Sequence, residues 1–305
     1  MDRKKIRIGI FASSHSLIDR VQALAAEQPD QFFLNTHGLD DAIPLALEMV
    51  RNGVEVIISR RGTAHLLREN LRIPVLSFPH RSLDILTSLT QAKEEGNKIL
   101  LPVFRHELGG FEVLEDLLHI TLVQHIYTDK ASLMQAVAKG REEGCDVVVG
   151  GSVTQQSAEA LDLKFVEIRT SEEDIVATIE NAKSVAIAAR DQKATALRYH
   201  AIIDAASDGL IAVDESGRIT AINETAAALL KLDKAATLGS HFAQVIPQAP
   251  ISQVLTTKKP IPDRLTRIDR ESFVFNCRTI TLERDIIGAV STFRDVSNVM
   301  RTEHV

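Results

Sequence analysis

The sequence predicts an α/β region of two lobes, each a parallel, doubly wound sheet, with a cleft between the lobes and an α+β domain after them. Three observations predict this fold class. Apolar runs of strand length alternate with helical stretches up to about residue 170, as in parallel sheets covered on both faces. The alternation restarts near residue 96. Beyond residue 199, short alternating segments and brief helices indicate an antiparallel sheet.

The expected elements follow one another along the chain with short connections. We expect strands at residues 6–12, 32–37, 54–59 and 75–78, then 98–104, 121–127, 146–149 and 165–168. We expect helices at residues 17–27, 40–52, 63–70 and 83–95, then 111–118, 130–143 and 154–161. An alanine-rich helix without Gly or Pro, capped by Ser171 or Thr170, should run from residue 172 to about 197.

One structural unit is used twice. "RNGVEVIISRRGTAHLLRENLRIPVLSF" and "EEGCDVVVGGSVTQQSAEALDLKFVEI" share a glycine, a strand, a polar or glycine-rich turn, a threonine, a helix and a closing strand, in that order. Gly53 aligns with Gly144, and Thr63 with Thr154. In open α/β sheets, ligands bind beyond the carboxyl ends of the strands. Two such lobes that face each other should therefore form a ligand cleft.

Composition excludes several classes of protein. The 305 residues carry a net charge of −6 with a pI near 5.9, which argues against a nucleic-acid surface along the whole chain. Only two cysteines occur, so we expect a reducing compartment and neither a disulfide nor a zinc framework. No apolar run approaches the roughly 20 residues of a membrane span, which predicts a cytoplasmic protein without a membrane partner.

Two turns that open helices are the main candidates for a binding site. Helix N-termini present unpaired N–H groups and partial positive charge, so they bind anions. The first turn, residues 60–63, places two guanidinium groups beside such amides. The second turn, residues 150–154, offers two glycines and two hydroxyls. Other strand ends should reach the same cleft. The candidate residues are Arg60, Arg61, Gly62 and Thr63; Gly150, Gly151, Ser152 and Thr154; and Ser13, Ser14, Arg81, Ser82, Phe104 and Arg105.

The predicted ligand is a small anionic metabolite. Arg60, Arg61, Arg81 and Arg105 together would form a cationic mouth suited to carboxylates. We expect the Arg60 and Thr63 side chains to face solvent or ligand rather than the core. The absence of GxGxxG and Walker patterns argues against a nucleotide, and the histidine spacing predicts no metal site. No cofactor is expected.

Two other functions stay open. An isomerase or lyase could use the same cleft, with Asp84 and His106 as its acid/base pair, although Asp84 is better placed to cap a helix. A pure interaction scaffold would dimerise and leave the cleft empty. The Asn-Cys-Arg sequence around Cys277 matches part of a flavin-reactive motif, but its alternating context predicts a strand, and His241 is expected to be a local cap.

Two stretches resemble known families. "VIISRRGTAHLLRENLRIPVLSFPHRSLDIL" and "GCDVVVGGSVTQQSAEALDLKFVEI" resemble the N-terminal sensor domain of propionate-catabolism operon regulators, which are sigma-54-dependent activators, over residues 5–190. "IIDAASDGLIAVDESGRITAINETAAALLKL" and "STFRDVSNV" are similar to the opening and the closing strand of a PAS domain.

The resemblance implies a domain plan. Residues 1–198 would form the effector-sensing domain, with the first lobe at about 1–82 plus helix 171–197 and the second at about 96–170. Residues 199–300 would form the PAS domain, and residues 301–305 the start of an output linker.

The resemblance also implies a function. The chain would be the input region of a regulator that senses a di- or tricarboxylate such as 2-methylcitrate and relays the signal through a PAS dimer. The AAA+ ATPase and the DNA-binding output have no counterpart in this sequence. Contacts with sigma-54 RNA polymerase, DNA and ATP would belong to those absent domains.

Overall fold

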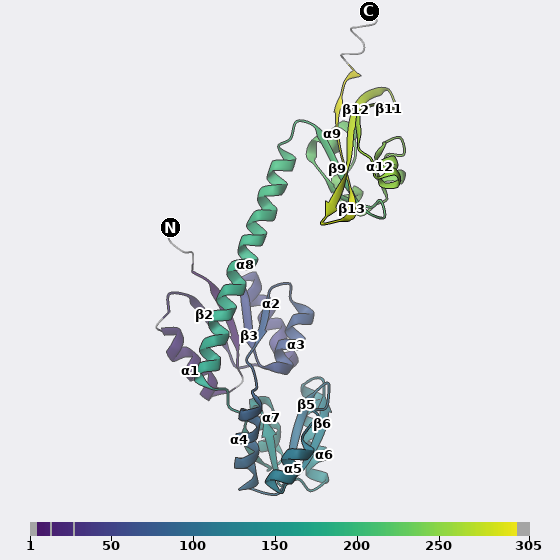
Figure 1. Ribbon diagram of the computed structural model, residues 1–305. Coiled ribbons are helices and arrows are strands. Elements are labelled where there is room, and N and C mark those ends of the chain that lie inside the picture. The colour runs from purple at the N-terminus through teal and green to yellow at the C-terminus, as the bar shows by residue number, and fades with distance from the viewer. Residues whose placement is uncertain (1–4, 13, 27, 298–305) are drawn as a thin grey trace, which may run out of the picture. The chain divides into compact units, whose positions relative to one another are not determined.

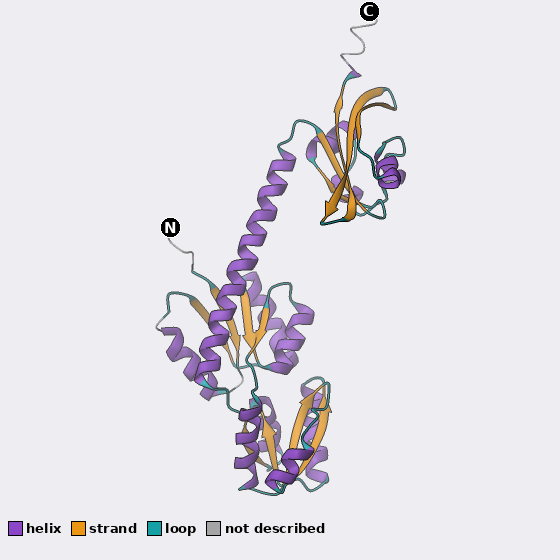
Figure 2. Ribbon diagram, in the orientation of Figure 1, coloured by secondary structure: helices purple, strands orange, loops and turns teal. Residues whose placement is uncertain are grey.

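The computed structural model describes residues 5–12, 14–26 and 28–297, and the chain divides into two compact units, Met1–Asp191 and Gln192–Val305. The first unit contains two four-stranded parallel sheets, and the second contains a five-stranded antiparallel sheet (Figure 2). The predicted fold class is confirmed.

The first lobe has the strand order β2-β1-β3-β4. Its elements are β1 Arg7–Phe11, α1 His15–Ala26, β2 Gln31–Asn35, η1 Leu39–Asp41, α2 Ala42–Arg51, β3 Val56–Ser59, α3 Arg61–Asn70 and β4 Val75–Ser77. Helices α1 and α8 cover one face of the sheet and share a core with it, whereas α2 and α3 cover the other face (Figure 1). Because both faces are covered, the central strands are buried throughout, as in Val56–Ser59.

The second lobe repeats this order as β6-β5-β7-β8. Its elements are α4 Ser82–Lys93, β5 Lys98–Phe104, α5 Glu112–Leu118, β6 Thr121–Tyr127, α6 Lys130–Glu142, β7 Val147–Gly150, α7 Ser152–Ala160 and β8 Lys164–Glu167. The sequence assigned helix α4 to neither lobe. In the structure its residues Leu89 and Ala92 belong to the core of the second lobe. The chain therefore crosses between the lobes twice, in the segments between β4 and α4 and between β8 and α8.

The repeat extends to the ends of equivalent helices. Gly53 and Gly144 follow α2 and α6 with φ of +88° and +76°, the left-handed conformation that glycine adopts most easily. The next residues, Val54 and Cys145, donate their N–H groups to carbonyls five positions earlier, which completes the same helix-ending motif in both lobes. Thus the two glycines that the sequence aligned have one physical role.

Helix α8, Glu172–Asp204, begins in the first lobe and extends into the second unit. Ser171 caps it, because its Oγ accepts a hydrogen bond from Asp174 N at 3.1 Å. The predicted end near residue 197 is too early. Residues of the second unit hold the last turn: Asn223 Nδ2 donates to Ile203 O at 3.0 Å, and Lys234 pairs with Asp204 at 2.9 Å. Such tertiary contacts are not visible in local sequence.

The second unit has the strand order β10-β9-β13-β12-β11. Its elements are β9 Gly209–Asp214, β10 Ile219–Ile222, α9 Glu224–Leu230, α10 Lys234–Thr237, α11 Phe242–Val245, α12 Ile251–Thr257, β11 Ile261–Ile268, β12 Glu271–Leu282 and β13 Asp285–Asp295. The sequence did not predict β11, which contains Pro262. This strand lies at the edge of the sheet, where a proline is tolerated because one side of the strand has no partner.

Aromatic side chains fill the core of this second unit. Phe275 and Phe293 stack with ring centroids 4.9 Å apart, and the remaining cavity beside them is about 10 Å³, room for about one water molecule. Cys277 lies on strand β12, as predicted, with its Sγ 3.0 Å from Ser291 Oγ. His241 is the predicted local cap, since its Nδ1 accepts from Ala243 N at 3.2 Å.

Two general features of the described residues bear on function. None of the helices in the described part of the chain has both the length and the apolar content needed to cross a membrane. Within residues 5–12, 14–26 and 28–297, no group of three or more His, Cys, Asp or Glu side chains is placed to hold a metal ion.

Candidate functional site

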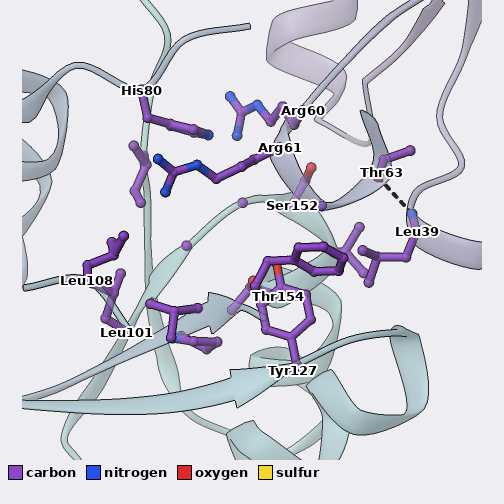
Figure 3. A pocket seen from close by; sticks show the side chains of 18 of the residues that line it. Leu39, Arg60, Arg61, Thr63, His80, Leu101, Leu108, Tyr127, Ser152 and Thr154 are labelled. Carbon is purple, nitrogen blue, oxygen red and sulfur yellow. Dashed lines mark hydrogen bonds between the residues drawn. The ribbon is translucent and has the colours of Figure 1, made fainter. Parts of the chain in front are cut away.

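A pocket lies between the two lobes of the first unit, where the carboxyl ends of β3, β5, β6 and β7 meet (Figure 3). The first lobe contributes the start of α3, the second lobe contributes the start of α7, and His80 comes from a segment that connects the lobes. The space available to the centres of water-sized molecules is about 100 Å³. A single water needs about 10–15 Å³ by this measure, so the pocket can hold a small metabolite.

Two helix N-termini open onto this pocket. Arg60 is the N-cap residue of α3 and Gly151 is the N-cap residue of α7, both in extended conformation. A methyl group on Gly151 would lie 3.5 Å from Arg60 Nη1, so the guanidinium group rests against the start of α7. Helix N-termini and guanidinium groups are both positive. Their close approach is unfavourable unless an anion lies with them.

The Arg60 side chain is 12% exposed and incompletely paired. Its Nη2 lies 3.5 Å from Glu167 Oε1, across the two lobes, whereas Nε and Nη1 are buried without a hydrogen-bond partner among the described residues. Burial lowers the pKa of Arg60, the neighbouring Glu167 raises it, and Arg20 lowers it further. Each buried donor without a partner lowers the stability of the fold by about 1–3 kcal/mol. A ligand that accepts hydrogen bonds from Arg60 would recover this free energy.

Two other polar atoms of the pocket are also unpartnered. Ser152 Oγ, on the first residue of α7, and His80 Nδ1 are buried and make no hydrogen bond to any described residue. Burial lowers the pKa of His80 to about 4, and the charges of Arg60 and Arg61 add to this effect. His80 is therefore neutral at pH 7. A bound anion could accept from the serine and offset the positive charge around the imidazole.

Arg61 completes the cationic side. Its side chain reaches into the space between His80 and Tyr127 (Figure 3), and it forms no ion pair with a described residue. The Arg61 charge lowers the pKa of both His80 and Tyr127. Burial is the larger effect on Tyr127 and raises its pKa to about 12, so the phenol stays protonated. The pocket thus offers two guanidiniums, neutral hydroxyls and helix amides, which suit a carboxylate.

Ion pairs at the rim join the lobes around the pocket. Arg105, after β5, donates to Glu69 Oε1 and Oε2 on α3 at 2.8 and 2.9 Å. Lys130, at the start of α6, pairs with Asp41, and its backbone N–H donates to Asp40 Oδ1 at 2.9 Å. These exposed pairs contribute little free energy individually. They are direct contacts between the two lobes.

The structure brings most of the candidate residues together. Arg60, Arg61, Gly62, Thr63, Phe104, Gly150, Gly151, Ser152 and Thr154 all line the pocket. Gly62 and Gly151, which belong to different lobes, therefore share one cavity. Gly150 is required by close packing, because a Cβ there would lie 2.7 Å from Thr154 Oγ1.

The remaining candidates do not line the pocket. Arg81 is exposed and pairs with the buried Asp174, and the exposed Ser82 begins α4. Arg105 pairs with Glu69 at the rim. Ser14 is buried and caps α1 by accepting from Leu17 N at 3.4 Å, and Ser13 lies outside the described residues. The cationic side of the pocket consequently has two of the four predicted arginines, Arg60 and Arg61.

The expected orientation of Thr63 was wrong. Its side chain is 6% exposed, and its Oγ1 accepts a buried hydrogen bond from Leu39 N at 2.7 Å (Figure 3). This bond satisfies the backbone where Leu39 adopts a positive φ of 54°. Thr63 is therefore partly a structural residue, although it borders the pocket.

The acid/base pair of the enzyme alternative is not assembled in the pocket. Asp84 caps α4, since its Oδ2 accepts from Arg81 N at 3.0 Å. His106 is exposed, and neither residue lines the cavity.

Sequence reasoning missed several lining residues. His80 lies in the connection after β4, and Tyr127 is the last residue of β6. The rule that ligands bind at the carboxyl ends of strands could have found both. Leu39, Leu101 and Leu108 carry no comparable signal, because an apolar residue at a ligand wall is indistinguishable in sequence from a core residue.

Comparison with known proteins agrees with this architecture. A family model described as propionate catabolism activator matches residues 27–192, and a PAS fold model matches residues 197–296. A crystal structure of an NtrC family transcriptional regulator from Clostridium acetobutylicum has a TM-score of 0.57 at 22% identity, with 61% of this chain and 99% of that chain covered. At this identity the likeness concerns the fold.

Two curated relatives are sensors. The sensor protein CitS of Halalkalibacterium halodurans is 32% identical over 103 residues, and the sensor histidine kinase DcuS of Escherichia coli is 32% identical over 107 residues. Each match covers 33% of this chain and 19% of the relative, so the chain spans about a fifth of their length.

Proposed function

The chain belongs to the propionate catabolism activator family and is a signal-sensing input region, and from this premise we propose that the pocket between its lobes binds a small carboxylate as the signal. One observation supports the assignment above all. Arg60 Nε and Nη1, His80 Nδ1 and Ser152 Oγ are buried without a partner among the described residues, and all three residues line one cavity. An anion would satisfy them together, and it would separate the guanidinium group from the start of α7.

The relay would begin with the relative position of the lobes. A ligand that contacts Arg60 on one lobe and Ser152 on the other binds the closed arrangement better than an open one, and it shifts the equilibrium by that difference in affinity. Helix α8 is continuous from the first unit into the second, which offers a covalent route to the PAS domain. The PAS domain would pass the signal on as a dimer.

The output would lie outside this sequence. We assign it to an AAA+ ATPase and a DNA-binding domain that act with sigma-54 RNA polymerase, as the family resemblance implies. An output on DNA would place the whole regulator in the cytoplasm.

A thermal-shift screen of mono-, di- and tricarboxylates tests the proposal on the full chain. A ligand at about one hundred times its dissociation constant should add about 2.7 kcal/mol to the free energy of unfolding. At the same ligand concentration the Arg60→Gln variant should lose most of this stabilisation, about 2 kcal/mol. Arg72→Gln removes an equal charge from an exposed site of the first lobe that does not line the pocket, and it should retain the stabilisation.

Two outcomes would contradict the proposal. If Arg60→Gln and Arg72→Gln respond to the ligand equally, the pocket is not the binding site. If NMR shows that the bound compound is converted into another, the chain is an enzyme and the sensor assignment fails.

A further inference from the structure

The pocket has two chemically different sides. Arg60, Arg61 and His80 stand on one side, and Leu101 and Leu108 stand on the opposite side of the same view (Figure 3). The two guanidinium groups come from the first lobe and the neutral His80 comes from the connecting segment, whereas the apolar side comes from the second lobe. A charged group of a ligand should therefore bind at the cationic side, and an apolar group should bind at the apolar side.

The apolar wall is continuous with the core of the second lobe. Leu101, Val103 and Ile168 are 3%, 4% and 8% exposed, and Ile85 and Leu108 pack against them. All five line the pocket. A carboxylate pressed against this wall would lose its water without gaining a donor, whereas an alkyl group would lose only unfavourable contact with water.

The size of the cavity limits the ligand further. The centres of water-sized molecules can occupy about 100 Å³ of the cavity, several times the roughly 10–15 Å³ that admits a single water. One or two carboxylates on a short carbon chain match this small space. The Arg60 charge is already partly offset by Glu167, so the cationic side has little charge left for a third carboxylate.

Building on the proposed function, we propose that the site selects small mono- or dicarboxylates that carry a short alkyl arm over fully polar tricarboxylates. The carboxylate end meets Arg60, Arg61 and Ser152, and the alkyl arm lies on the wall of Ile85, Leu101 and Leu108. Each added methylene that is buried there should improve affinity about fourfold.

A series of probes measured by isothermal titration calorimetry on the full chain tests the selection. The series is succinate, 2-methylsuccinate and 2-ethylsuccinate, with tricarballylate as the probe whose branch is charged and butyrate and valerate as monocarboxylates. The dissociation constant of ethylsuccinate should be about sixteenfold lower than that of succinate. Tricarballylate should bind more weakly than ethylsuccinate.

Matched variants locate the effect. Leu108→Ser should reduce the succinate-to-ethylsuccinate ratio of dissociation constants from about sixteen towards one, because the arm loses its apolar partner. Leu83→Ser makes the same change on α4 at a side chain that is 68% exposed and outside the pocket, and it should keep the ratio.

The outcomes separate this inference from the proposed function. Tricarballylate binding that depends on Arg60 and exceeds ethylsuccinate binding would overturn the selection and leave the sensor site in place. An unchanged ratio in Leu108→Ser would do the same. If no member of the series binds, or if Arg60→Gln binds all of them normally, both proposals fail.

Discussion

The turn before α3 and the turn before α7 occupy equivalent places in sheets of the same strand order, yet they carry different chemistry. Both helices have a threonine at the third position, Thr63 and Thr154. At the N-cap, α3 has Arg60 where α7 has Gly151. The shared frame therefore turns two helix N-termini towards one cavity, while the first lobe supplies the charged side chains.

If the pocket binds the proposed carboxylate, the two lobes contribute different groups to its recognition. Gly151, at the start of α7, carries no side chain, and Arg60 of the other lobe lies against it. The first lobe provides charge, and the second provides a hydroxyl on Ser152 and an apolar wall. A ligand must contact both lobes to satisfy both sets of groups.

His80 should report the charge of the first turn. Its pKa is lowered to about 4 by burial and by Arg60 and Arg61, so the unfolded chain, with a histidine pKa near 6.5, binds its proton first as pH falls. The free energy of unfolding should therefore keep its full value above pH 6.5. It should fall by up to about 3 kcal/mol as pH decreases from 6.5 to about 4. Urea unfolding at several pH values, compared with His80→Gln, measures this loss.

The two turns should differ in how His80 responds to their mutation. Arg61→Gln should raise the pKa of His80, because one of the charges that lower it is removed. Ser152→Ala should leave that pKa unchanged, and NMR titration of the imidazole follows both. If the serine variant moves the pKa as far as the arginine variant, the charge does not come from the first lobe alone.

Ligand affinity should show the same asymmetry. Arg60→Gln should weaken carboxylate binding about thirtyfold, since a hydrogen bond to a charged group is worth about 2 kcal/mol. Ser152→Ala should weaken it about fivefold, as for a neutral hydrogen bond of about 1 kcal/mol. Calorimetry of the single and double variants measures both effects and their coupling. Independent effects in the double variant would indicate that the two groups do not hold the same ligand.

Much of this frame could be predicted from sequence. The order of strands and helices, the repeat and the glycines that end α2 and α6 all depend on local patterns, and the structure confirms them. The helix-opening turns are local features too. For this reason the residues of both turns could be named before their positions in space were known.

The partners of charged side chains could not be predicted in this way. Arg81 pairs with Asp174, 93 positions away, and Arg105 pairs with Glu69, 36 positions away. The end of a strand fixes the position of an arginine backbone. Its long side chain, however, pairs with whichever carboxylate the fold brings within reach. Acids from other parts of the fold pair with Arg81 and Arg105, whereas Arg60 and Arg61 retain N–H donors at the pocket that no described residue pairs.

The equivalent threonines should differ in their effect on stability. Thr63→Val keeps the volume but removes the acceptor of the Leu39 N–H, so the free energy of unfolding should fall by about 1–2 kcal/mol. Thr154 has no such hydrogen bond to a described residue, and Thr154→Val should change stability by less than about 0.5 kcal/mol. Urea unfolding measures both. Equal losses would mean that the two positions have the same structural role.

The smallest effect is expected from the glycines of the two turns. A methyl group on Gly62 would lie 3.0 Å from both Leu39 Cδ2 and Phe104 Cδ2, so Gly62→Ala presses on a side chain of the opposite lobe. A methyl group on Gly151 would meet Arg60 Nη1 at an ordinary 3.5 Å. We expect Gly62→Ala to lower the free energy of unfolding by about 0.5–1 kcal/mol, at the low end for overpacking because the crowded atoms are side-chain ends.

Gly151→Ala should change stability by less than about 0.5 kcal/mol, and it is the matched control for the same substitution in the other lobe. The Gly62 variant should also loosen the contact between the lobes, which faster hydrogen exchange in both rim segments, around Glu69 and Lys130, would detect. Exchange that rises equally in both variants would show that Gly62 does not determine how closely the lobes approach. The first turn would then differ from the second in charge alone.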